Sequence, residues 1–182
     1  MKKLLSLLVL TGTLFAQANN VFTLNPSVNS SAMGNVGIAH ADVKNVFHNP
    51  AFAGLNKRHQ EISYVDWLPN LTDDMGYQSI LYTSDLGWSS EIFYFNYGTQ
   101  VEADQGGIII GDFESSSYRV SGGYGFGIGD WLFGARLNLY NHNFIDSFDV
   151  DMNYGFDLGA YKEFGNTSLG IVLKDVGGET KF

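Results

Sequence analysis

The stretch WLFGARLNLY, from Trp131 to Tyr140, decides the fold of this chain. Large apolar side chains recur in it at every second position, interrupted by Gly134, Arg136 and Asn138. Successive side chains of a β-strand point to opposite faces, whereas a helix repeats every 3.6 residues. The stretch is therefore predicted to be a strand with one apolar face and one small or polar face.

The same alternation recurs from residue 61 onward and predicts an all-β, antiparallel protein. Several of the segments are long enough to cross a bilayer as tilted strands. The predicted strands are 61–67, 76–83, 89–98, 117–126, 131–141, 153–163 and 168–175.

Long and short connections alternate between these strands. Residues 68–75, 99–116 and 141–152 form long loops, and residues 84–87, 127–130 and 165–167 form short turns. Outer-membrane barrels have this sorting, with the short turns on the periplasmic side. The strands of a soluble β-sandwich also alternate apolar and polar residues, but that fold has no reason to place long loops at one end and short turns at the other. We therefore predict an antiparallel transmembrane β-barrel.

Aromatic residues near the predicted strand ends support a membrane barrel, because such barrels carry aromatic girdles at both interfaces. The candidate girdle residues are Tyr64, Trp67, Tyr82, Trp88, Tyr97, Trp131, Tyr140 and Tyr161.

Composition excludes several classes of protein. The chain has 182 residues, no cysteine and a net charge of −9. The absence of cysteine excludes a disulfide scaffold and a Cys-ligated metal site. The acidic balance argues against nucleic acid as a partner. Charged residues make up 16% of the chain, aromatic residues 15%, and there are 22 glycines. A soluble enzyme usually has fewer aromatic residues and glycines, and a helical membrane protein is less polar than this chain.

Residues 1–18 are predicted to be a cleaved signal peptide. Lys2 and Lys3 precede an apolar run from Leu4 to Phe15, and Ala16-Gln17-Ala18 fits the small-x-small cleavage pattern. The run is too short for a membrane-spanning helix. We therefore expect an exported protein that resides in the outer membrane, with lipid around it.

Residues 19–60 differ from the rest and are predicted to form a short helical plug segment. Asp42 is expected to cap a short helix running to Phe47, and Pro50 to end it with Asn49 extended. Small residues around them allow close packing inside a barrel. The structural plug motif is Asp42, Asn49, Pro50 and Ala51.

Charged residues fall at two kinds of position. Arg136 and Asp157 lie on the inward faces of neighbouring predicted strands and are expected to pair in the lumen. Carboxylates gather in two long loops, where a basic partner, Ca²⁺ or plain solvent could meet them; no EF-hand spacing is present. The candidate docking residues are Glu102, Asp104, Asp112, Glu114, Asp146, Asp149 and Asp151.

No motif for catalysis or cofactor binding is found. The four histidines lack metal-ligand spacing, and Ser115 to Ser117 form no nucleophile elbow. Gly125 to Gly129 is Gly-rich, but a strand follows it rather than the helix N-terminus that a phosphate site needs. We expect a protein that is not an enzyme and has no cofactor or metal.

The plug segment also carries a family resemblance. SAMGNVGIAHADVKNVFHNPAFAGL (Ser31 to Leu55) resembles the N-terminal signature of the PorV/PorQ family. Residues 96–120, 156–161 and 169–182 are similar, in order, to the PorQ branch. The resemblance implies a FadL-like barrel of fourteen strands. Residues 61–182 would then be the first seven strands, and the chain a fragment of a longer barrel.

The resemblance also implies a function. Members of the family serve the type IX protein secretion system, where they work in the cell-surface attachment complex with PorZ-, PorU- and PorV-like proteins. We therefore expect a barrel that anchors partner proteins through its extracellular loops. The alternative is a FadL-like outer-membrane transporter of hydrophobic small molecules.

Overall fold

Seven strands form one antiparallel sheet in a computed structural model that describes residues 21–70, 72, 74–143 and 152–177. Each strand pairs with its neighbours in chain order, so β1 and β7 are the edges of the sheet. The prediction of an all-β antiparallel protein is confirmed. The strands are β1 His59–Asp66, β2 Gly76–Thr83, β3 Trp88–Ala103, β4 Ile109–Ile128, β5 Trp131–Asn143, β6 Asn153–Phe164 and β7 Thr167–Val176.

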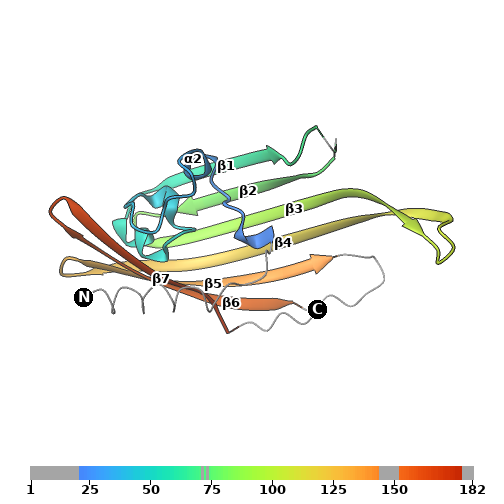
Figure 1. The fold of residues 1–182 in the computed structure, drawn as a ribbon. Helices are drawn as coiled ribbons and strands as arrows, with labels where there is room; N and C mark the ends of the chain where they lie inside the picture. Colours follow the sequence, from blue (N-terminus) through green and yellow to red (C-terminus); the bar gives the residue numbers. More distant parts are fainter. Residues whose placement is uncertain (1–20, 71, 73, 144–151, 178–182) are drawn as a thin grey trace, which may run out of the picture.

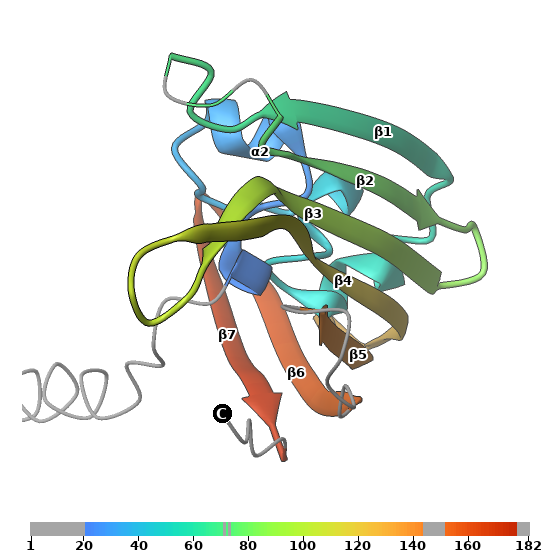
Figure 2. The ribbon, with the colours of Figure 1, turned by 90° about the vertical axis from the view of Figure 1, so that its right-hand side faces the viewer.

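The sheet curls around the N-terminal segment (Figures 1 and 2). That segment contains four short helices: η1 Val21–Thr23, α2 Val28–Ala32, η2 Val43–Asn45 and η3 Pro50–Leu55. We call the face of the sheet that packs on them the inner face, and the opposite face the outer face. Among the described residues no helix is long and apolar enough to span a membrane.

The strand register puts polar side chains on the inner face and apolar side chains on the outer face, as the period of two in the sequence predicts. Leu137 lies opposite Phe156, and Arg136 lies opposite Asp157. Residues paired across an antiparallel ladder share a face. Arg136 and Asp157 are buried on the inner face, whereas large apolar side chains such as Leu158 are about half exposed, at 50%, on the outer face. The outer face is thus apolar along all seven strands.

Aromatic side chains from the plug and the sheet form the largest inner cluster. Phe22 packs against Tyr77, Phe93 and Phe95 of β2 and β3. The Phe22 and Phe93 rings meet edge to face, with centroids 6.5 Å apart. Burying such large rings is a major stabilising term. This cluster fixes the start of the plug segment against the inner side of the sheet, and we call the seven-stranded sheet the wall.

The predicted loop 99–116 is wrong in its extent. β3 continues to Ala103 and β4 begins at Ile109, so only residues 104–108 turn. A bulge between Asn96 and Thr99, with Gly98 at a φ of 74°, shifts the register there. The bulge interrupts the period of two, which hid the strand. Figure 1 shows the β3–β4 hairpin extending beyond its neighbours.

The candidate girdle residues divide between the two faces of the sheet. Tyr64 and Trp88 are exposed on the outer face, at 64% and 59%. Tyr161 is buried beside Phe52, and Trp67 packs on the Phe22 cluster. Position parity decides this, because a residue one place along a strand points to the other face. Tyr97 and Tyr140 also pack on the inner cluster.

Candidate functional site

Two capped 3-10 helices shape the plug where it meets the wall. The Asp42 side chain accepts a hydrogen bond from the Lys44 N–H at 3.0 Å, and that of Asn49 accepts one from the Ala51 N–H at 3.0 Å. Asp42 thus caps a helix as expected, but the expectation of one helix running to Phe47 and ended by Pro50 is incorrect. η2 stops at Asn45, and Pro50 begins η3, because proline fits the first helical position, where no N–H is needed.

Asn49 joins separate parts of the chain. Its side chain is fully buried, and its amide donates to the carbonyl of Ile38 at 2.9 Å and to that of Ala160 at 3.2 Å. Asn49 itself is extended, as the following proline favours. One side chain therefore caps η3, holds an earlier part of the plug and binds β6.

A row of glycines on the inner face lets the plug approach the wall closely. Gly125, Gly134 and Gly159 lie opposite one another on β4, β5 and β6. A Cβ on Gly134 would overlap the backbone of Pro50, and a Cβ on Gly159 would overlap the side chain of Asn49. The sequence motif Asn49-Pro50-Ala51 thus lies directly against this glycine row.

Four charged side chains lie buried beside the row. Arg119 and Glu91 form an ion pair between β4 and β3, with Arg119 Nε donating to Glu91 Oε1 at 2.9 Å. Arg136 Nη2 lies 2.6 Å from Asp157 Oδ2, which confirms the expected pair. None of the four is more than 5% exposed. Buried charges need partners, and here they partner each other.

The same arginines bind the plug. Arg119 donates to the carbonyl of Phe22, and Arg136 Nη2 donates to the carbonyl of Phe47 at 3.2 Å. Each guanidinium therefore joins a wall carboxylate to a plug carbonyl, using the several donors that arginine presents in one plane. The Glu91–Arg119 pair was missed from the sequence. Its signal was the placement of both residues at inward positions of adjacent strands.

Phe47 sits among three cations. Its ring centroid lies 4.8 Å from Arg119 Cζ, 5.2 Å from Arg136 Cζ and 3.9 Å from Lys174 Nζ. Cations over an aromatic face are attracted by its quadrupole, more strongly where water is excluded. Phe47 is therefore the apolar anchor of the plug in a charged part of the wall.

A bulge in β7 brings a further carboxylate inward. Asp175 has a φ of 52°, and the β6–β7 register shifts between Phe156 and Leu158. The Asp175 N–H donates to Asp157 Oδ1 at 2.9 Å, and Tyr140 donates its hydroxyl hydrogen to Asp175 Oδ1. Lys174 already faces inward, and a strict period of two would turn the next residue, Asp175, outward. The sequence pattern therefore could not predict that Asp175 contacts Tyr140 and Asp157.

His48 connects parts of the plug to each other. Its Nε2 lies 2.9 Å from Asn25 Nδ2 and 3.0 Å from Ser30 Oγ. Burial, reinforced by the positive charges of Lys174 and Arg136, lowers the pKa of His48 to about 4. The ring is therefore neutral at neutral pH.

The acidic candidates lie elsewhere, at the far end of the β3–β4 hairpin. Glu102 lies on β3, Asp112 and Glu114 on β4, and Asp104 in the turn between the two strands. Asp104 Oδ1 accepts hydrogen bonds from two backbone N–H groups of its own turn, at 2.8 and 2.9 Å. Asp146, Asp149 and Asp151 lie outside the described residues, as does the expected signal peptide 1–18.

Comparison of the chain with protein-family models, curated proteins and solved structures found no match. Within the part of the chain that the structure describes, no group of three or more His, Asp or Glu side chains could hold a metal ion. What the site does is inferred here from its own contacts. Its buried charges are engaged with each other and with backbone carbonyls, an arrangement that holds the plug segment against β3 to β6.

Proposed function

We propose that this protein is an outer-membrane β-barrel component of the type IX secretion system, of the PorV/PorQ kind, that anchors partner proteins at the cell surface. The observation that carries the proposal is the contrast between the two faces of the sheet. The outer face exposes large apolar side chains on every strand, while the inner face buries ion pairs under a plug. A lipid-facing apolar surface around a polar interior is the pattern of outer-membrane barrels.

The extent of the apolar surface supports a membrane location over a soluble β-sandwich. Soluble monomers seldom expose contiguous apolar patches of more than a few hundred Å². Here Ile62 at 81%, Ile92 at 51% and Leu173 at 58% exposure come from β1, β3 and β7, so the apolar surface spans the sheet. Lipid would cover it.

Closure of the barrel requires further strands. An open sheet edge is not tolerated in lipid, so β1 and β7 must both be paired. Strands β1 and β7 run in the same direction, because the strand direction alternates along the seven-stranded antiparallel sheet. An antiparallel barrel then needs an odd number of additional strands from outside the described residues. Seven more would give the fourteen of the FadL-like architecture.

The extended β3–β4 hairpin is the proposed docking surface. Residues 99–116 contain Glu102, Asp104, Asp112 and Glu114 and no lysine or arginine. Three isoleucines at 108–110 are exposed near the tip, at 61–69%. Complementary charge steers association and selects partners. A PorZ- or PorU-type partner would therefore present an apolar patch surrounded by basic residues.

The transporter alternative gains no specific support from the inner face. A carrier of hydrophobic molecules needs an apolar cavity and a plug that opens. The described inner face instead carries Arg119, Arg136 and their carboxylate partners, which bind the plug directly. Secretion is therefore the function we propose.

Outer-membrane fractionation, heat-modifiable gel mobility and co-purification from the native bacterium test the proposal. Neutralising the hairpin (Glu102→Gln, Asp104→Asn, Asp112→Asn and Glu114→Gln together) should lower recovery of attachment-complex proteins at least tenfold. Neutralising Asp85 and Glu163, which are exposed near short turns at the opposite end, should leave recovery unchanged. Absence from the outer-membrane fraction would contradict the proposed function, and unchanged recovery would contradict the docking surface.

A further inference from the structure

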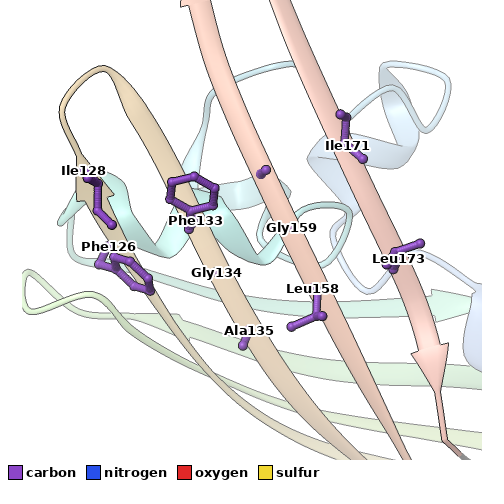
Figure 3. Close-up of a pocket in the computed structure, with 10 residues that line it drawn as sticks. Phe126, Ile128, Phe133, Gly134, Ala135, Leu158, Gly159, Ile171 and Leu173 are labelled. Atoms are coloured by element: carbon purple, nitrogen blue, oxygen red, sulfur yellow. The ribbon is translucent and has the colours of Figure 1, made fainter.

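The outer face of β4 to β7 is hollowed. A depression of about 600 Å³ opens there, and every residue lining it is apolar or glycine. Figure 3 shows the side chains of Phe126, Phe133, Ile171 and Leu173 standing around it. The depression lies on the side of the sheet away from the plug, so its occupant would come from outside the barrel.

Two alanines create the hollow. Ala135 pairs with Tyr124 on one side and Leu158 on the other, and Ala160 pairs with Phe133 and Ile171. Cross-strand neighbours stand about 5 Å apart, so a small side chain among large ones leaves a gap beside it. Gly134 and Gly159 add bare backbone between the alanines. The hollow thus follows from residue sizes in the register.

Of the lysines and arginines on the described strands, one lies at one end of the hollow. Lys162 is the next outward residue after Ala160 on β6, and its Nζ lies 5.4 Å from the Trp131 ring centroid and 5.0 Å from that of Phe164. The carboxylate of Asp130, 84% exposed, is 3.7 Å away. Among the described strands, the other lysines and arginines lie at positions 119, 136 and 174, where they face Phe47 on the inner side.

We propose that this hollow binds an acyl chain of a phospholipid whose phosphate is bound by Lys162. The site rests on the membrane location proposed above. Lys162 lies near the short turns, which face the periplasm in such barrels. The lipid would therefore come from the periplasmic leaflet, where phospholipid phosphates meet the wall at the level of Trp131 and Lys162.

Hydrocarbon suits the hollow better than a peptide does. β5 and β6 are paired on both sides, so the ladders engage their backbone groups. The apolar lining offers no donor or acceptor, and an extended peptide placed there would leave its own backbone groups unpaired at a cost of several kcal/mol each. An acyl chain has no such groups and gains by covering the apolar wall.

Photo-crosslinking in membranes tests the site. The full-length protein is reconstituted in phosphatidylethanolamine vesicles that contain an analogue with a diazirine in its acyl chain, and labelled peptides are mapped by mass spectrometry. Labelling should concentrate on 126–135 and 158–173. Ala160→Leu, which fills the hollow, and Lys162→Gln, which removes the cation, should each lower it at least fivefold, while Lys162→Arg should retain it.

Matched variants separate this site from general lipid contact. Ser90→Leu adds similar bulk at an exposed position of β3, and Lys57→Gln removes an exposed charge before β1; both should leave labelling unchanged. Even labelling over all strands, insensitive to Ala160→Leu and Lys162→Gln, would overturn the site while leaving the membrane location intact. A protein that does not enter the vesicles at all would contradict the proposed function as well.

Discussion

Arg136 and Asp157 face each other across β5 and β6, and both Nε and Nη2 of Arg136 donate to Asp157 Oδ2, at 2.9 and 2.6 Å. The same Nη2 donates to the carbonyl of Phe47. The pair is therefore shared between the wall and the plug. An uncharged side chain at position 136 should therefore loosen the plug and remove the cation that pairs with the buried Asp157 carboxylate.

Arg136→Leu should destabilise the protein by about 3–5 kcal/mol, because removing one partner leaves Asp157 charged and buried. Urea unfolding in phospholipid vesicles measures this, and limited proteolysis should show faster cleavage within residues 21–56. Arg58→Leu is the control, since its ion pair with Asp85 is exposed and such pairs contribute about 0–1 kcal/mol. Equal effects of the two variants would contradict the proposed role of the pair.

Gly159→Ala should displace the plug from the wall. The new methyl group would overlap Asn49 and Pro50, and overpacking of this kind costs about 1–3 kcal/mol. Gly122→Ala is the matched control on β4, because a Cβ there meets nothing within 4 Å. Proteolysis of the plug should accelerate only in the Gly159 variant, and equal rates in both variants would count against close contact at the glycine row.

Much of this arrangement could be predicted because a strand repeats every two residues. That period placed Arg136 and Asp157 on the same inner face, and their pairing followed from register alone. The period fails at bulges. At Gly98 a bulge concealed the extension of β3, and at Asp175 another turned a second consecutive side chain inward.

Contacts between the plug and the wall could not be predicted for a different reason. Glycine has no side chain to produce a hydrophobic pattern, so the row at 125, 134 and 159 is visible only once strand register is known. Carbonyl groups carry no sequence signal either, and both arginines bind the plug through carbonyls, those of Phe22 and Phe47. The Asn49-Pro50 motif could be recognised in the sequence, but its packing against β6 could not be predicted.

Asn49→Ala should cost more than Asp42→Ala, although both residues cap a 3-10 helix. Loss of a cap costs about 1 kcal/mol. Asn49 also donates hydrogen bonds to the carbonyls of Ile38 and Ala160, and losing these two bonds adds roughly 1–3 kcal/mol in total. Urea unfolding of the two variants measures the difference. Equal losses would mean that Asn49 acts as a cap alone.

The plug should loosen in acid through His48. Its pKa in the folded protein is about 4, below the ordinary 6.5, because burial and the charges of Lys174 and Arg136 disfavour the cation. Between these values the unfolded chain binds the proton and the folded protein does not. Stability should therefore fall, by roughly 1–3 kcal/mol in total, as the pH drops through about 6.5 to about 4, with little His48 contribution to the slope above about pH 7.5.

His48→Gln tests this, since glutamine keeps a polar group near Asn25 and Ser30 but does not titrate. Free energies of unfolding measured from pH 8 to pH 4 should decline less for the variant than for the wild type. His59→Gln is the control, because His59 lies at the start of β1 and bonds Glu61 instead of Asn25 and Ser30. Parallel curves for wild type and His48→Gln would show that protonation of His48 is not what weakens the plug.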